Sequence, residues 1–461
     1  MRSFLNKDAD CVAVAETVAR RDRVGFMELY FIVVIQRGRD STLRILRGGF
    51  FPIALGDDEN RTGLGELDGG AKTGHTRSDY KKVRFQSRWV WIQVHMVQRK
   101  VMATFSVRTP AHQYDCVVAR GCVAQLADRI PDKSGNVFVV TTEDVWDLHG
   151  RKIEQSLGSR SFHALFFPGG EERKRMVEVE ILAEQMVELG ADRSSIVVSF
   201  GGGIVGDLAG FLAAIFMRGI SVIQVPTTLL AQVDAAIGGK TGANLVSGKN
   251  LIGAFHQPLA VLIDPDLLTT LTPREYRAGL YEVVKCGIIR SPRLFGIMHN
   301  QPHQVLARDP ATVEEIVAQS VRIKAEVVTA DEKESGLRRI LNFGHTLGHA
   351  LEAETRYAHL LHGEAVAFGM RAATHLGWSL GTCPEPDARA ILESIGAYGK
   401  IPPLTHIRAE NLVARLGSDK KTIQGKVHFV LPKHIGETEI RSGIDGAAIL
   451  AATGQALAEL A

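Results

Sequence analysis

Residues 195–200, SIVVSF, run directly into residues 201–210, GGGIVGDLAG, and this join indicates the fold class. The first six residues are mostly apolar, which predicts a short buried strand. The glycines that follow satisfy G-x-G-x-x-G where a helix would begin, and they are Gly201, Gly203 and Gly206. Backbone amides at such a turn can hold a pyrophosphate, but the ribose-binding acid expected about 20 residues later is missing. The join therefore predicts a strand, a turn and a helix, with dinucleotide binding and a simple tight turn as the two interpretations.

The same alternation extends outward from this join. Strand-like apolar runs, separated by helix-length stretches, occupy residues 103–107, 115–119, 136–140, 164–167, 220–225 and 261–263. Such alternation predicts a mostly parallel sheet. After Pro265 the strand pattern ends, and helical spacing of apolar residues covers residues 274–289, 312–329, 346–356 and 363–380. The sequence thus predicts a Rossmann-like α/β domain over residues 102–270 and an all-α domain over residues 271–461, with a cleft where they join.

Composition places the chain among ordinary globular proteins. It has 461 residues, a formal net charge of +3, 45% hydrophobic residues and 23% charged residues. No run reaches the about 18 consecutive apolar residues that a membrane span requires. The five cysteines form no C-x-x-C pair, so neither a disulfide framework nor a redox motif is predicted. We therefore expect a cytoplasmic enzyme without a membrane segment.

Residues 1–101 differ in character from the rest of the chain. They carry a net positive charge, while the remainder is net negative, and they lack a sustained period of 2 or 3.6. A basic module that binds nucleic acid or a partner is one interpretation, but few aromatic residues beyond Trp89 and Trp91 would support it. The favoured interpretation is a poorly ordered leader or a start codon assigned too early, because a strand-like run follows Met102 directly.

Two Gly-Lys pairs resemble phosphate loops at first sight. Lys240 is followed by Thr241, yet the first glycine of a P-loop would fall at position 234, which is Asp234. Lys249 is followed by Asn250 where a P-loop has Ser or Thr. An NTPase is therefore disfavoured, and the remaining combination of lysine, amide and carboxylate suits an anionic, hydroxylated ligand.

Histidines and carboxylates in the C-terminal half suit a divalent metal. His345 and His349 share one helical face at i and i+4, and a zincin is disfavoured because residue 346 is Thr instead of Glu. Glu282 and His362 lie on other expected helices and could complete a set of one carboxylate and two imidazoles. Spacing leaves open which histidines are the ligands, and capping or core histidines are the alternative.

Further basic residues occur at positions that the apolar packing face of a helix would not favour. These residues are Lys285, Lys324, Arg338, Lys420 and Lys421. Each alone is ordinary surface charge. Together, within a net negative body, they predict a positive cleft for a substrate that carries phosphate and carboxylate groups.

Seven motifs now carry a family resemblance, and they are GGGIVGD at 201–207, VPTT at 225–228, Asp234 with IGGKT at 237–241, GKNLIG at 248–253, YEVVK at 281–285, NFGHTLGH at 342–349 and HGEA at 362–365. In this order they resemble the 3-dehydroquinate synthase family of the sugar phosphate cyclases, from about Met102 to the end of the chain. The resemblance implies conversion of 3-deoxy-D-arabino-heptulosonate 7-phosphate to 3-dehydroquinate and phosphate in the shikimate pathway. It also implies bound NAD and a divalent metal, zinc or cobalt, with transient oxidation, phosphate β-elimination, reduction and intramolecular aldol closure.

The resemblance also implies roles for individual residues. The metal ligands would be Glu282, His345 and His362. The NAD contacts would be Glu171, Lys174, Gly202, Gly203, Gly206, Asp207, Thr227, Thr228, Lys240 and Lys249, with Glu143 or Asp144 on the ribose. The phosphate contacts would be Lys240, Asn250, Asn342, His349 and one of Lys420 and Lys421. The hydroxyl and carboxylate contacts would be Asp234, Lys285, Lys324 and Arg338, with Glu334 nearby. Arg218 would reach the phosphate site of a second subunit, which predicts a homodimer.

Two related activities remain as alternatives. Other sugar phosphate cyclases act on sedoheptulose 7-phosphate or glucose 6-phosphate, substrates without a carboxylate. A metal-dependent polyol dehydrogenase of similar fold would release NADH. Lys324 with Arg338 favours the substrate that bears a carboxylate, and the lysine and asparagine cluster argues against the dehydrogenase.

Overall fold

The structure is a computed structural model that describes residues 102–357, 359–418 and 427–460, with the backbone of five short strands before them. The chain divides into two units, Met1–Val101 and Met102–Ala461. In the first unit the described strands are β1 (Val12–Ala13), β2 (Val33–Val34), β3 (Ile45–Leu46), β4 (Lys81–Phe85) and β5 (Arg88–Val94). They form one sheet in the order β3-β1-β2-β5-β4. The prediction of a poorly ordered leader otherwise lies outside the described residues.

The second unit begins with a seven-stranded sheet. Its strands are β6 (Ala103–Arg108), β7 (Gln113–Val118), β8 (Val137–Thr141), β9 (Phe162–Phe166), β10 (Ile196–Gly201), β11 (Ser221–Pro226) and β14 (Ala260–Ile263). The order is β6-β7-β14-β11-β10-β8-β9, and only β6 with β7 pairs antiparallel. The predicted mostly parallel sheet is therefore confirmed, and each predicted apolar run falls on one of its strands.

Helices cover both faces of this sheet because the central strands are apolar on both sides. On β8, Val137 and Val139 pack with α1 (Glu143–Leu157). Phe138 and Val140 face the other way, into a core shared with α2 (Met176–Glu188) and α3 (Gly203–Ile215). Strands buried on both faces read as continuous apolar runs, which is why the sequence pattern identified them.

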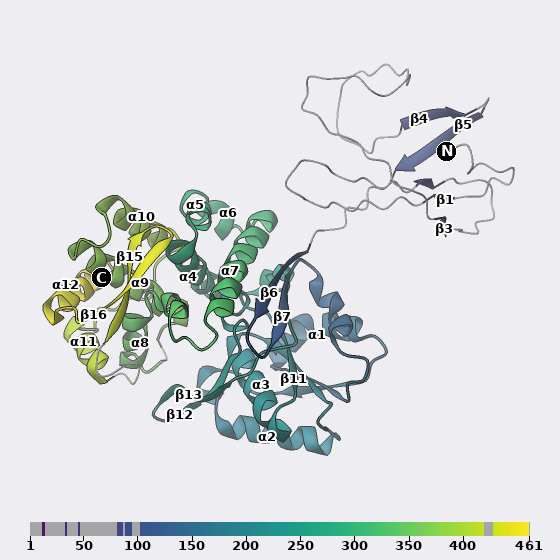
Figure 1. Ribbon diagram of the computed structural model, residues 1–461, viewed down its shortest axis with the longest axis horizontal. Helices are drawn as coiled ribbons and strands as arrows, with labels where there is room; N and C mark the ends of the chain where they lie inside the picture. Colours follow the sequence, from purple (N-terminus) through teal and green to yellow (C-terminus); the bar gives the residue numbers. More distant parts are fainter. Residues whose placement is uncertain are drawn as a thin grey trace. The chain divides into compact units, whose positions relative to one another are not determined.

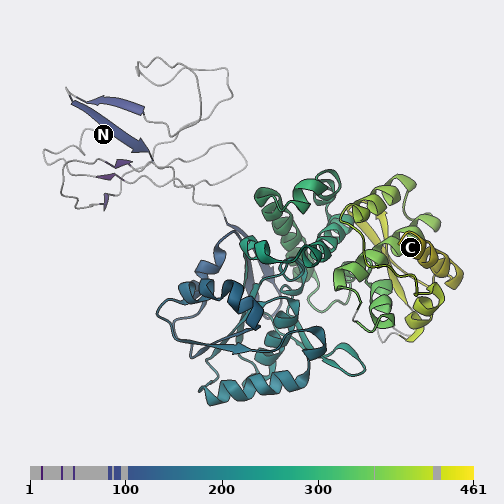
Figure 2. The same ribbon diagram turned by 180° about the vertical axis from the view of Figure 1, so that it is seen from behind.

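Helices dominate the rest of the second unit and lie beside the sheet in both views (Figures 1 and 2). Their bounds are α4 (Pro273–Arg290), α5 (Pro292–Asn300), α6 (Pro302–Leu306), α7 (Pro310–Ala330), α8 (His345–Glu354), α9 (His362–Ser379), α10 (Glu385–Gly396), α11 (Ala409–Ser418) and α12 (Gly446–Ala458). Three of them begin with a side-chain cap followed directly by proline, and the caps are Thr272, Ser291 and Asp309. Each cap accepts a hydrogen bond from the first turn, and proline at the first position costs no hydrogen bond. In the part of the chain that is described, no helix is both long enough and apolar enough to cross a membrane.

The all-α prediction for residues 271–461 needs one correction. Strands β15 (His428–His434) and β16 (Glu437–Ser442) pair as an antiparallel hairpin. Gly436 makes the turn with a φ of 95°, a value that favours glycine. The hairpin packs on α9, where the buried side chains of Phe429 and Leu431 join the helical core.

The lysines of the two Gly-Lys pairs lie on a second hairpin. Strands β12 (Lys240–Leu245) and β13 (Gly248–Phe255) pair antiparallel. The two strands approach closely at Gly242 and Gly253, where a β-carbon on either glycine would collide with the opposite backbone. The hairpin thus places Lys240 on one strand and Lys249 on the other.

Candidate active site

Three helices bring one carboxylate and two imidazoles together, and we call Glu282, His345 and His362 the metal-ligand group. Glu282 is fully buried on α4, while His345 and His362 are the first residues of α8 and α9. The Glu282 Oε1 atom lies 3.8 Å from Nε2 of each histidine. One ligand atom from each residue lies within 4.8 Å of the others, so a single divalent ion can contact all three.

The electrostatics of this group fit a metal. Among the described residues, none donates a hydrogen bond to Oε1 of the buried Glu282 carboxylate, while the other oxygen forms an ion pair with Lys285. A buried anionic oxygen without a donor is costly unless a cation occupies the space beside it. Burial and the Lys285 ammonium also hold the pKa of His345 well below its ordinary value, so its imidazole is neutral. Neutral imidazole nitrogen and carboxylate oxygen are the ligands that zinc and cobalt take in proteins.

His349 and Glu352 lie one and two turns further along α8. The His349 ring centroid is 5.3 Å from that of His345 and 6.0 Å from that of His362. His349, Glu352 and His362 also offer three ligand atoms within 4.8 Å of one another. Glu352 was missed at the sequence level, although its position seven residues after His345 places it on the same helical face.

A half-buried carboxylate and a buried lysine lie next to the metal-ligand group. Asp234, on a short π-helical turn (Ala231–Ala235) after β11, forms an ion pair with Lys324 of α7. Burial raises the pKa of Asp234, but the Lys324 and Lys285 ammonium groups outweigh it and hold the pKa below its ordinary value. The carboxylate is therefore ionised, and Lys324 is 7% exposed with its charge directed at it.

Arg338 is the largest fully buried side chain of the described residues. Its guanidinium donates to the backbone carbonyls of Glu332 and Gly238, the latter at 3.1 Å. Its Nε has no acceptor within the described part of the chain. A buried guanidinium with an unpartnered N–H can accept a further anionic oxygen as a partner.

Glu334 connects two residues that were predicted to contact phosphate. Its carboxylate forms an ion pair with Lys240 and accepts a hydrogen bond from the Asn342 side-chain amide. Burial lowers the pKa of Lys240, while the Glu334 carboxylate opposes that effect. A phosphate group would find the same lysine and amide donors that the Glu334 carboxylate uses.

The glycine-rich turn lies at the carboxyl edge of the parallel sheet. Gly202 caps α3, and a β-carbon there would approach the Thr228 methyl group to 3.0 Å. Thr227 donates its backbone N–H to Gly201 at 2.9 Å, so the turn and the end of β11 form one surface. Gln224, in the region where an acid was expected, donates at 3.2 Å to the Gly206 carbonyl and thereby holds the helix on the sheet.

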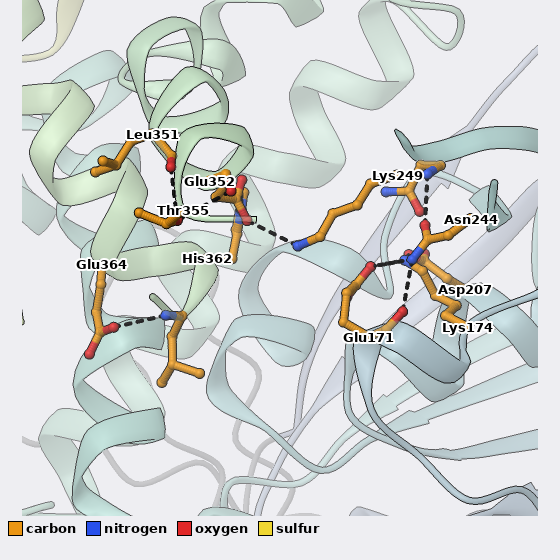
Figure 3. A network of polar contacts seen from close by, with 12 residues as sticks. Glu171, Lys174, Asp207, Asn244, Lys249, Leu351, Glu352, Thr355, His362 and Glu364 are labelled. Atoms are coloured by element: carbon orange, nitrogen blue, oxygen red, sulfur yellow. Dashed lines mark hydrogen bonds and ion pairs between the residues drawn. The ribbon is translucent and has the colours of Figure 1, made fainter. Parts of the chain in front are cut away.

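Further predicted nucleotide contacts, Glu171, Lys174 and Asp207, lie close to one another (Figure 3). The Lys174 ammonium, 3% exposed, lies 2.9 Å from the Asp207 carboxylate and 3.4 Å from that of Glu171. Glu171 also accepts a hydrogen bond of 2.7 Å from the Asn244 side chain on β12. Gly203 and Gly206 lie in the first turn of α3.

The two candidate ribose contacts lie side by side in the sequence, at the start of α1. Glu143 and Asp144 follow β8 at the same edge of the sheet, where both are exposed in the first turn of α1.

Two predicted site residues, Asn250 and Arg218, stand apart from this arrangement, and two others are not described. Lys420 and Lys421 lie outside the described residues. Asn250 is exposed on β13, where its backbone N–H donates at 2.8 Å to Asn244. Arg218 lies just before β11 and therefore at the amino edge of the sheet, opposite the glycine-rich turn. It lines a surface pocket of about 300 Å³ together with His112, Arg193 and His256, so one chain does not bring it to the other site residues.

The fold and site define a class of protein in which a nucleotide-binding α/β half joins a helical half with a metal-ligand group. Residues 164–278 match the family model described as 3-dehydroquinate synthase N-terminal, and residues 279–422 match 3-dehydroquinate synthase C-terminal. The chain is 60% identical over 357 residues to 3-dehydroquinate synthase of Solibacter usitatus (strain Ellin6076), a match over 77% of this chain and 100% of the relative. The chain belongs to the 3-dehydroquinate synthase family.

Two solved structures share this architecture. A 2-deoxy-scyllo-inosose synthase complexed with carbaglucose-6-phosphate, NAD+ and Co2+ has 27% identity and a TM-score of 0.69, over 76% of this chain and 99% of that chain. ValA (2-epi-5-epi-valiolone synthase) from Streptomyces hygroscopicus subsp. jinggangensis 5008, with NAD+ and Zn2+ bound, has 29% identity and a TM-score of 0.70. That match covers 76% of this chain and 98% of that chain.

Proposed function

We propose that the chain is a 3-dehydroquinate synthase, which converts 3-deoxy-D-arabino-heptulosonate 7-phosphate to 3-dehydroquinate and phosphate. The observation that carries this proposal is the metal-ligand group beside buried Lys324 and Arg338, in a chain 60% identical to a relative of that name. Two buried cations at one site suit a substrate that carries a carboxylate as well as a phosphate. The reaction comprises oxidation of a hydroxyl, β-elimination of phosphate, reduction and aldol closure.

The residues present fit both expected cofactors. Glu282, His345 and His362 would hold a zinc or cobalt ion, and the glycine-rich turn with Glu171, Lys174, Asp207, Thr227 and Thr228 would hold NAD. When bound, NAD takes up and returns a hydride, and the metal polarises the substrate hydroxyl. The protein supplies the orientation and the electrostatic environment in which this chemistry is fast.

The side chains around the metal-ligand group would bind and orient the substrate. Lys324 and Arg338 would hold its carboxylate, and Asp234 and Lys285 its hydroxyl groups. The phosphate would be bound by side chains from the hairpin and the helical part, which are Lys240, Asn342 and His349. Because Glu334 already pairs with Lys240 and Asn342, substrate binding would exchange the carboxylate for phosphate on the same donors.

A homodimer is part of the proposal. Arg218 lies at the opposite edge of the sheet from the site, and this position supports a role at the site of a second copy. Arg218 has a φ of 74° and Met217 a φ of 48°, so the short turn after α3 has an unusual backbone. A cytoplasmic location also belongs to the proposal, because the cysteines of the second unit are free buried thiols.

The alternative substrates are separated by one parallel assay. Purified protein with NAD and zinc or cobalt is incubated with 3-deoxy-D-arabino-heptulosonate 7-phosphate and, separately, with sedoheptulose 7-phosphate. We expect phosphate release and a cyclic product from the first alone, without net NADH. Turnover of the second alone would move the function to another cyclase and withdraw the carboxylate roles of Lys324 and Arg338. Net NADH without phosphate release would indicate a dehydrogenase.

A further inference from the structure

Both histidines of the metal-ligand group present the same nitrogen to Glu282. The Nε2 atoms of His345 and His362 each lie 3.8 Å from Glu282 Oε1. An imidazole that binds a metal through Nε2 carries its proton on Nδ1, and an acceptor beside Nδ1 fixes both the tautomer and the ring orientation. Each histidine therefore needs a partner on its far side.

The two histidines obtain that partner in different ways. The Nδ1 atom of His345 lies 3.1 Å from the backbone carbonyl of Phe343. The Nδ1 atom of His362 lies 3.4 Å from Oε2 of Glu352 on the neighbouring helix α8. The first acceptor belongs to the backbone and is unaffected by substitution, whereas the second is a side chain that a single substitution removes.

Glu352 is built into a bridge between the helical half and the hairpin (Figure 3). It is 3% exposed, and its other oxygen, Oε1, lies 3.2 Å from the Lys249 ammonium on β13. Lys249 also lies 4.5 Å from the centre of the Tyr357 ring, which restricts where its charge can go. One carboxylate thus contacts a metal ligand through one oxygen and a predicted nucleotide contact through the other.

We propose that Glu352 is a positioning residue that holds His362 in the orientation and tautomer that metal binding requires, and that ties this ligand to Lys249. The proposal rests on the proposed function, because it takes the metal-ligand group as the metal site. Glu352 contacts no reacting atom. Its contribution is to keep Nε2 of His362 directed at Glu282, as the Phe343 carbonyl does for His345.

A different role for Glu352 would be direct ligation of a second ion with His349 and His362. The Lys249 ammonium argues against it, because a cation already lies within 3.2 Å of the carboxylate and would repel another. Ligation through Nδ1 of His362 would also remove the proton that the Glu352 contact uses. The two roles predict different numbers of bound ions.

The test compares Glu352→Gln with Glu354→Gln in the full chain. Both substitutions remove one negative charge from α8, but Glu354 pairs with Arg415 and Asn411 on the surface and has no contact with the metal-ligand group. Zinc affinity is measured without substrate by competition with a chromophoric chelator, and cobalt(II) absorption reports the ligand geometry. We expect a 10- to 100-fold weaker zinc affinity and an altered cobalt spectrum for Glu352→Gln, the loss typical of removing a histidine's outer partner. For Glu354→Gln we expect wild-type values.

A third variant separates the two contacts of Glu352. Lys249→Met removes the ammonium and leaves the carboxylate beside His362, so zinc affinity should stay within about threefold of wild type. If Glu352→Gln does not fold without metal, Glu352→Asp retains the charge but withdraws the carboxylate from Nδ1, and zinc affinity should still fall at least fivefold.

Several outcomes would overturn the inference. Wild-type zinc affinity in Glu352→Gln, or in Glu352→Asp when that variant replaces it, would show that His362 needs no such partner. Two zinc ions per wild-type chain and one in Glu352→Gln would make Glu352 a ligand. A wild-type protein that binds no zinc would instead contradict the proposed function.

Discussion

Substitution of Gly363 by alanine tests how the packing of two helices sets the geometry of the metal-ligand group. Gly363 follows His362 in the first turn of α9, and a β-carbon there would lie 1.9 Å from the backbone carbonyl oxygen of Ala278 on α4. The closest comfortable distance between a carbon atom and a carbonyl oxygen is about 3.3 Å. The distance between these two atoms must therefore increase by about 1.4 Å. Neither atom can turn away, because the oxygen is part of the α4 backbone and the β-carbon is bonded directly to the α9 backbone. The two helices must therefore move apart.

That displacement is large compared with what a metal site tolerates. Glu282 lies one turn after Ala278 on α4, and His362 precedes Gly363, so the shift separates two proposed ligands of one ion. Structural metal sites keep ligand distances within about 0.2 Å of their preferred values. We expect zinc affinity to fall at least tenfold in Gly363→Ala, measured by chelator competition.

The free energy of unfolding of Gly363→Ala is a second measurement, and two opposing effects contribute to it. In an open helical position, alanine in place of glycine would stabilise by about 1 kcal/mol. At Gly363 the collision should outweigh this gain and lower the free energy of unfolding by about 1–3 kcal/mol, as overpacked cores do. Gly454→Ala on α12 is the matched control, because no atom lies within 4 Å of the added carbon and stability should rise or stay the same. Wild-type zinc affinity and stability in Gly363→Ala would refute the reasoning.

Three further predictions concern other parts of the molecule. Lys324→Met should lower kcat/KM for phosphate release by about 10- to 100-fold, because a charge-assisted contact contributes about 1.5–3 kcal/mol. The Kd for NAD should stay unchanged. An unaltered kcat/KM would contradict the contact assigned to Lys324. Burial raises the pKa of Asp331, but three backbone N–H groups outweigh it and hold the pKa at about 2, below the ordinary 3.8. The ionised Asp331 carboxylate therefore stabilises the fold above pH 3.8, and this contribution disappears as the pH falls toward 2. In urea titrations, Asp331→Asn should have a lower free energy of unfolding than wild type at pH 7 and the same free energy of unfolding near pH 2. A chain of residues 102–461 should retain full turnover, because this segment forms one compact unit, and a folded but inactive product would assign a role to the removed residues.

The fold was largely predictable because its signals are local. The seven strands of the main sheet are short apolar runs, and α4, α7, α8 and α9 show helical spacing over ten residues or more. The hairpin of β12 and β13 gave no such signal. Its strands contain glycine, asparagine and lysine, and their pairing depends on the close approach at Gly242 and Gly253, a contact between segments that no local pattern encodes.

The sequence predicted which residues form the candidate site but not which side chains contact one another there. Residue types and motifs predicted Glu282, His345 and His362, which the structure brings within reach of a single ion, and the basic residues around them. They did not show that Asp234 pairs with Lys324, or that Glu334 pairs with Lys240, because these partners are 90 and 94 residues apart. Glu352 was missed for the same reason, since its partner Lys249 is 103 residues away.

Glycines allow the close crossing of α8 and α9, the two helices that carry the candidate metal-ligating histidines. At the crossing of α8 and α9, a β-carbon on Gly348 would lie 2.9 Å from the Ala365 carbonyl oxygen, and one on Gly369 would lie 1.8 Å from that of Gly344. Glycine lowers helix propensity by about 1 kcal/mol, so by local preference these residues argue against helices here. They are needed because only a bare backbone lets the helices approach closely enough for the rings of His345 and His362 to lie 5.2 Å apart beside Glu282. Glycines inside apolar helices next to candidate ligands are therefore a sequence signal for where two ligand-bearing helices cross.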